Sequence, residues 1–145
     1  MKIISENTFE KARKEIQKAK PPIIFSSNDD ELNRKILEKE PIQVLLINQT
    51  GRKDYQKQRN SGFNQVMAKI AKKTKILIGI NLDEIIQSTG KTRAEILARI
   101  KQNIKLCNKN KLNMTFLGKN KRGSHDLKAL GLSLGMPTWM FKSLN

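Results

Sequence analysis

Basic side chains are the residues of this chain best suited to a chemical role, and many of them gather in two short segments that each follow an apolar, strand-like run. The first segment, residues 50–73, contains Arg52, Lys53, Arg59 and Lys69. The second, residues 118–123, contains Lys119, Lys121 and Arg122. Guanidinium and ammonium groups bind phosphate, and helix amides from Ser61 onward would add donors. We therefore predict a phosphate-binding surface; a solvated basic loop capped by Ser61 is the alternative.

The overall charge supports a polyanionic partner. The chain has 29 Lys and Arg residues against 13 Asp and Glu, a net charge of +16. Such self-repulsion is common in proteins that bind nucleic acid. A lysine-rich proteome would give a similar composition without that function. Because the basic residues recur in connecting segments and along helices, we expect a folded basic face and not a disordered arm.

Other reactive groups are too few to build a familiar catalytic site. His125 is the only histidine and Cys107 the only cysteine, so a multi-histidine or zinc site is not expected. The sequence has no glycine-rich phosphate loop. Asp29-Asp30 and Asp83-Glu84 lie near expected helix starts, where carboxylates complement the helix dipole. We predict no catalytic residue, no metal or cofactor bound by the protein, and a buried, inert Cys107.

The positions of the basic segments depend on an alternation of short strands and helices. Apolar runs predict strands at 3–4, 23–25, 44–47, 76–80, 114–117 and 132–134. Amphipathic patterns predict helices over 7–20, 29–38, 61–73, 92–109 and 126–130, the fourth opened by a capping box at Thr92. Strands that are apolar on both faces are typical of a parallel sheet.

This order predicts an α/β protein with about six βα units in one domain, residues 1–145. An open doubly wound sheet and part of a (β/α)8 barrel both fit the periodicity. A complete barrel takes roughly 200 to 250 residues, so a barrel formed by this chain would be truncated. In a parallel sheet both basic segments follow the carboxyl ends of strands, where ligands of such folds collect.

Residues 59–71, RNSGFNQVMAKIA, and the strand and turn at 76–82 resemble the central signature of ribonuclease P protein component 3, a subunit family of archaea and eukaryotes. Further similarity lies at 92–94, 114–117 and 126–136, so the resemblance extends from about residue 22 to 136. Departures are the family's histidine, replaced by Gln65, and a common arginine, replaced by Asp83. The chain also begins about two βα units into the family pattern.

The resemblance implies a TIM-barrel-like fold related to metal-dependent phosphoesterases, but without the histidines of their first strand. It implies a non-catalytic subunit that supports ribonuclease P RNA, together with ribonuclease P protein component 2, in removing the 5′ leader of precursor tRNA. The RNA would do the chemistry with magnesium. The side chains expected to contact RNA are Arg52, Lys53, Arg59, Lys69, Arg93, Lys119, Lys121, Arg122 and His125.

Two other functions are alternatives: a metal-dependent phosphoesterase of the related barrel fold, and a generic basic ribosome-associated protein. No apolar run approaches the roughly 20 residues of a membrane span, and we expect an archaeal cytoplasmic protein. The predicted strands 3–4 and 132–134 would border the gap in the barrel. Residues 137–145, closure of a smaller barrel, or a second chain would cover these edges; we favour a second chain, either component 2 or another copy.

Overall fold

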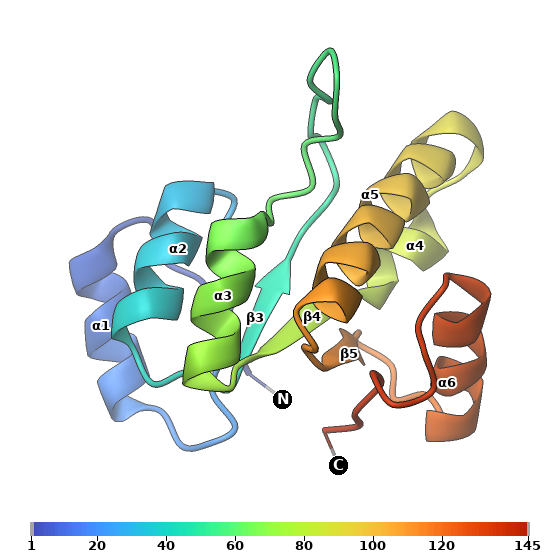
Figure 1. Ribbon diagram of the computed structural model, residues 1–145. Helices are drawn as coiled ribbons and strands as arrows, with labels where there is room; N and C mark the ends of the chain where they lie inside the picture. The colour runs from blue at the N-terminus through green and yellow to red at the C-terminus, as the bar shows by residue number, and fades with distance from the viewer. Residues whose placement is uncertain (1, 145) are drawn as a thin grey trace.

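A five-stranded parallel sheet forms the centre of the computed structural model, which describes residues 2–144 (Figure 1). Its strands follow one another in sequence order, and each neighbouring pair is parallel. They are β1 (Ile3–Ile4), β2 (Ile24–Phe25), β3 (Val44–Ile47), β4 (Leu77–Asn81) and β5 (Met114–Leu117). The predicted parallel sheet is confirmed.

Helices fill every connection between these strands. They are α1 (Phe9–Lys18), α2 (Asp30–Lys39), α3 (Gln65–Thr74), α4 (Leu82–Gln87), α5 (Gly90–Lys109) and, after β5, α6 (Ser124–Ser133). In Figure 1, α1, α2 and α3 lie side by side across one half of the sheet, and α5 lies next to α3. Sequential parallel strands with intervening helices are the arrangement of neighbouring units in a βα barrel. The prediction of a truncated, barrel-like fold is confirmed, with five strands instead of six.

The strands are apolar on both faces because each face of the sheet packs in an apolar cluster of its own. Leu45 and Ile78 belong to the main core, which the sheet shares with the helices. Val44 and Leu46 alternate with them and pack on the opposite face in a smaller apolar cluster with Ile24 and Leu117. This two-sided burial explains the continuous hydrophobic runs of the sequence.

Two helix starts differ from the sequence prediction. Helix α3 begins at Gln65, where the side chain of Asn64 accepts a hydrogen bond from the amide of Met67, and not at Ser61. Helix α5 begins at Gly90 after Thr89, so the expected capping box at Thr92 lies inside the helix. In both cases another polar residue of a suitable type lies close by in sequence. At α3, contacts of Ser61 with Gln49, Gln102 and Asn103 hold it outside the helix.

The sixth predicted strand, 132–134, is wrong. Leu132 and Ser133 end helix α6, and Leu134 follows as its C-cap. A run of Leu-Ser-Leu fits a strand or a helix end equally well when it is this short. Helix α4 was not predicted; it follows β4 directly, and the side chain of Asn81 accepts a hydrogen bond from the amide of Glu84 at its start.

The segment after α6 covers the outer edge of β5. The amide of Met114 donates to the carbonyl of Met140 at 3.0 Å, and the amide of Lys142 donates to the carbonyl of Met114 at 2.9 Å. The Phe141 ring lies 6.0 Å from that of Phe116. The C-terminal segment is therefore the cover of this edge, where we had favoured a second chain; Asn145 of that segment lies outside the described residues.

Met140 should matter for stability because its side chain is fully buried beneath this covering segment. We expect Met140→Ala to lower the free energy of unfolding by about 2–4 kcal/mol, through lost burial and a residual cavity. Urea unfolding followed by circular dichroism measures the change. Thr138→Ala, at an exposed neighbouring position, is the control and should change stability by less than about 0.5 kcal/mol. Equal effects of the two substitutions would contradict the assigned role of Met140.

Candidate nucleic-acid interface

A long connection between β3 and α3, residues 48–64, projects beyond the sheet and the helices (Figure 1, green). It begins at the carboxyl end of β3 and contains the first basic segment. Loops of this length are ordered only when their polar groups find partners. Three side chains from different elements supply those partners at the base of the loop.

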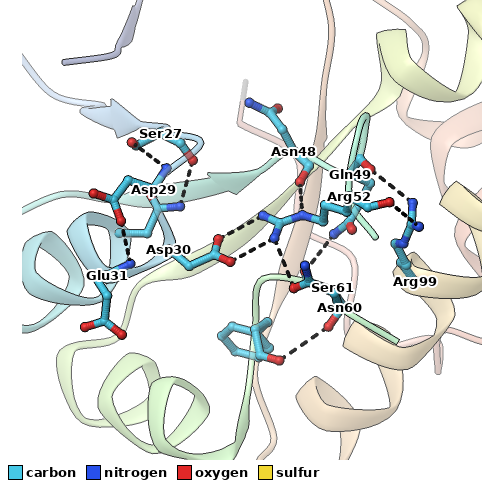
Figure 2. Close-up of polar contacts among 12 residues, drawn as sticks. Ser27, Asp29, Asp30, Glu31, Asn48, Gln49, Arg52, Asn60, Ser61 and Arg99 are labelled. Carbon is cyan, nitrogen blue, oxygen red and sulfur yellow. Dashed lines mark hydrogen bonds and ion pairs between the residues drawn. The ribbon is translucent and has the colours of Figure 1, made fainter. Parts of the chain in front are cut away.

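Arg52 is the first anchor and acts from within the loop. Its two terminal nitrogens pair with both carboxylate oxygens of Asp30 at 2.9 Å, and its Nε donates to the carbonyl of Asn48 at 2.7 Å (Figure 2). Only 9% of the side chain is exposed. Gly62 passes over this guanidinium with φ +75°, and a Cβ there would collide with Arg52 and with Ile47. Arg52 therefore joins the loop to α2, whereas the sequence predicted a phosphate contact.

Arg99 is the second anchor, and sequence reasoning missed it. It lies on α5 with 4% of its side chain exposed. Its Nε pairs with Oδ1 of Asp54 at 2.9 Å. Its other nitrogens donate to the carbonyls of Gln49 at 3.2 Å and Arg52 at 2.7 Å (Figure 2). A charged residue inside the apolar stripe of Ile96 and Ile100 was the signal that could have identified it.

Glu84 is the third anchor. One of its carboxylate oxygens accepts from the amide of Gln49 at 2.8 Å and the other from the amide of Thr50 at 2.6 Å. The sequence analysis placed Asp83-Glu84 near a helix start, and both residues lie in the first turn of α4, a helix that it did not otherwise predict. Glu84 also orders the loop.

Ser61 does not open a helix whose amides could bind phosphate, as the sequence analysis predicted, because α3 begins only at Gln65. Ser61 is 2% exposed, and its carbonyl accepts from Gln49 and Asn103 at 2.8 and 3.1 Å. Its hydroxyl donates to the carbonyl of Phe63 and accepts from Gln102. Ser61 fixes the descending arm of the loop against α5.

Beyond these anchors the tip of the loop is exposed and basic. Lys53, Tyr55 and Lys57 face solvent, and Arg59 keeps 45% of its side chain exposed while pairing with Asp54 at 3.0 Å. The hydrogen bond from Arg99 holds the pKa of Asp54 below 3.8, against the opposing effect of burial, and the Asn60 amide and Arg59 lower it further. The one carboxylate at the tip is thus shared by two arginines.

The second basic segment follows β5 at the same edge of the sheet. Lys119, Lys121 and Arg122 are all exposed, as is His125 in the first turn of α6. The amide of Lys119 donates to Oδ2 of Asp83 at 3.0 Å, which fixes the start of this loop against α4. Strand β4 is the only strand between β3 and β5. The two basic loops therefore leave the sheet on either side of the carboxyl end of β4.

Of the two remaining predicted contact residues, Arg93 lines a hollow together with Arg122, and Lys69 lies outside both loops. Arg93 donates from Nε to the carbonyl of Ile85 at 3.0 Å and from Nη2 to that of Ile86 at 3.1 Å, so it stabilises the carboxyl end of α4. Lys69 is exposed on α3, outside both loops. The structure thus leaves two exposed basic groups that each follow a strand at the carboxyl edge: Lys53 and Arg59 after β3, and Lys119, Lys121, Arg122 and His125 after β5. Arg52 and Arg93 are engaged in hydrogen bonds within the protein.

Other potentially reactive side chains are either buried or too far apart to act together. Cys107 is fully buried, and burial raises the pKa of its thiol to about 12, as expected of an inert cysteine. Within residues 2–144, no three His, Cys, Asp or Glu side chains are placed to share a metal ion. No helix in this part of the chain is both long and apolar enough to cross a membrane.

Comparison with known proteins gives a consistent set of relatives, although no family model matches the chain. Ribonuclease P protein component 3 of Methanococcus maripaludis strain C7 is 24% identical over 105 residues, which are 72% of this chain and 43% of the relative. That of Methanococcus vannielii is 27% identical over 111 residues, 75% of this chain and 46% of the relative. The chain spans less than half the length of these curated relatives.

A solved structure shares the fold. A chain in a cryo-EM structure of archaeal ribonuclease P with mature tRNA superposes with a TM-score of 0.78 at 21% identity, covering 95% of this chain and 61% of that one. The resemblance to ribonuclease P protein component 3, predicted from residues 59–71, is confirmed by these relatives.

Arg99 should control the order of the loop. We expect Arg99→Met to speed tryptic cleavage after Lys53, Lys57 and Arg59 at least tenfold, because hydrogen bonds to a buried charged group are each worth about 1.5–3 kcal/mol. Lys101→Met, an exposed position on the same helix, is the matched control and should leave cleavage unchanged. Similar cleavage rates for wild type and Arg99→Met would show that the loop is held without this anchor.

Acid should release the same loop at an unusually low pH. Since the folded-state pKa of Asp54 lies below 3.8, its contribution to loop stability is complete above the unfolded value and is lost as the pH falls through the folded value. The amide of Asn60, which donates to Asp54 at 3.0 Å, reports this step in an NMR titration. We expect its transition below pH 3.8, and a shift upward in Arg99→Met. A wild-type transition at or above 3.8 would refute the interpretation.

Proposed function

We propose that this chain is a non-catalytic RNA-binding subunit of ribonuclease P, and that it supports the catalytic RNA in removing the 5′ leader of precursor tRNA. The observation that carries the proposal is the pair of exposed basic loops at one edge of the sheet, in a chain similar to ribonuclease P protein component 3. The fold shared with a chain of archaeal ribonuclease P supports the same conclusion.

The exposed cations are suited to binding phosphate groups. The fixed geometry of the loops is suited to recognising the shape of a folded RNA. Lys53, Lys57, Lys121 and Arg122 have no ion-pair partner within the described residues. Folded RNA is recognised mainly through its backbone and shape, so cations held on fixed loops provide both affinity and register. We assign the surface to the RNA subunit and not to a small-molecule substrate.

Carboxylates at this edge favour a binding role over a phosphoesterase. Asp29 caps α2, Asp30 pairs with Arg52, Asp54 pairs with Arg99, and Asp83 and Glu84 bind backbone amides. These five acidic groups are therefore engaged in capping a helix or holding the loops, whereas Asp126 in the first turn of α6 is exposed. We propose that catalysis belongs to the RNA with its magnesium ions, that this protein binds no cofactor, and that alone it leaves precursor tRNA uncut.

Protein partners belong to the same proposal. The outer side of β1 has no strand neighbour within residues 2–144, and Ile3 is 42% exposed there. An open strand edge is a ready site for another chain. We place ribonuclease P protein component 2 at this edge, with a second copy of this chain as the alternative, and we propose action in the archaeal cytoplasm.

Binding to a ribonuclease P RNA transcript tests the function directly. We expect the purified chain to bind an archaeal ribonuclease P RNA more tightly than a plain RNA duplex of equal length, with an affinity that falls steeply as salt rises because bound phosphates release counterions. Fluorescence anisotropy over a salt series gives the slope of log affinity against log salt. No preference for the structured RNA, or no dependence on salt, would remove the proposal.

Neutralised variants locate the surface. Lys121→Gln with Arg122→Gln should flatten the slope by about 1.5 units, from roughly 0.7–0.9 unit per lost phosphate contact. Lys14→Gln with Lys18→Gln, an equal change of charge on α1, is the control and should have no more than a small effect. If the control pair flattened the slope as much, the interface would lie elsewhere on the protein.

A further inference from the structure

Tyr55 is exposed in a way that packing does not explain. It lies at the tip of the β3–α3 loop with 59% of its surface exposed, more than any other aromatic residue described. Phe25, Phe63 and Phe116 are buried, and the Trp139 ring is covered by the ammonium of Lys111 at 5.7 Å. An aromatic ring left in solvent offers a free face for stacking.

The loop below Tyr55 is rigid even though its tip is exposed. Arg52, Arg99 and Glu84 fix its first arm to α2, α5 and α4. Gln102 and Asn103 of α5 hold the second arm at Ser61. The tip is therefore held away from the body of the protein by bonds that do not involve the tyrosine. A fixed aromatic ring loses little conformational entropy when a ligand stacks on it.

A polar groove adjoins the tyrosine. It measures about 540 Å³ and is lined by Tyr55, Gln58, Arg59 and Asn60 on the loop and by Arg34 on α2. The Gln58 side chain and Nδ2 of Asn60 form no hydrogen bond within residues 2–144. The groove thus contains free amide groups of the kind that bind base edges, between two arginines of the kind that bind phosphate.

We propose that Tyr55 and this groove bind an unpaired nucleotide of the RNA, with the base stacked on the tyrosine ring and its edge facing Gln58 and Asn60. The inference rests on the RNA-binding function proposed above and adds the class of RNA feature recognised. A base inside a duplex presents no free face to the ring, whereas bases in loops and bulges stack readily on aromatic side chains. Arg34 and Arg59 then flank the nucleotide's phosphates.

Two RNAs of equal phosphate count test the proposal: a hairpin with a single-stranded loop and a fully paired duplex. Tyr55→Ala should weaken binding of the hairpin roughly tenfold, as loss of one stacked base does, and leave binding of the duplex and the salt slope unchanged. Tyr55→Phe, which keeps the ring, should stay within about twofold of wild type. Leu132→Ala is the control, since Leu132 is a 46% exposed apolar residue on α6, outside the groove.

A direct optical signal separates stacking from other effects. The chain has one tryptophan, so Trp139→Phe combined with Tyr55→Trp places a single indole at the tip. We expect the hairpin to quench its fluorescence and the duplex to leave it unchanged.

Each other outcome decides between the hypotheses. A wild-type protein that binds neither RNA would overturn the RNA-binding function itself. Binding of both RNAs with no selective loss in Tyr55→Ala would overturn only the nucleotide site, as would an equal loss for hairpin and duplex. Quenching by component 2 and not by the hairpin would assign the tip to a protein partner and refute the inference.

Discussion

Two buried arginines, Arg52 and Arg99, hold the β3–α3 loop, which carries the first group of exposed basic side chains. Taking a guanidinium out of water costs several kcal/mol unless the charge is paired and hydrogen-bonded, and Arg52 and Arg99 each have a carboxylate partner and at least one carbonyl acceptor on the loop. Their partners lie on different elements: Arg52 reaches α2, and Arg99 reaches out from α5. The loop can therefore take its shape only when the helices are already packed on the sheet. Local order at the basic tip is a consequence of tertiary structure.

The pairing of carboxylates with buried arginines and backbone amides also affects the electrostatics of the carboxyl edge of the sheet. Near the carboxyl ends of the strands, Asp29, Asp30, Asp54 and Asp83 are engaged by a helix cap, arginines and a backbone amide, whereas Asp126 is exposed. The lysines of the two loops have no ion-pair partner within the described residues, and Lys53, Lys57 and Lys121 are exposed. A polyanion at the β3–α3 loop thus meets cations whose local carboxylates are already engaged. Net charge alone could have come from a lysine-rich composition; this segregation is an observation that composition does not account for.

Sequence patterns predicted the strands and the positions of the loops. They missed the roles of side chains whose partners lie far away in the sequence. The five real strands, the parallel sheet and the placement of both basic loops follow from apolar runs and their order. Arg52 and Lys53 look alike in sequence, yet one is internal and the other exposed, because only Arg52 reaches Asp30. Ser61 resembles a helix cap, but contacts from Gln49 and Asn103 fix it before the helix begins. The internal roles of Arg93 and Arg99 likewise depend on carbonyls that sequence spacing does not reveal.

Side chains at the carboxyl ends of barrel strands usually point inward and supply reactive groups. Here the inward row consists of Ser26, Asn48 and Asn81, which bond to one another: Asn48 donates to Ser26 at 3.1 Å, and Asn81 donates to Asn48 at 2.9 Å. These groups are neutral at any ordinary pH, and their hydrogen bonds are directed at each other. The charged and aromatic side chains of this edge lie instead on loops that project away from the sheet. An edge that satisfies its own inner polar groups and presents cations outward is suited to a large external polyanion, which supports the proposal that it binds RNA.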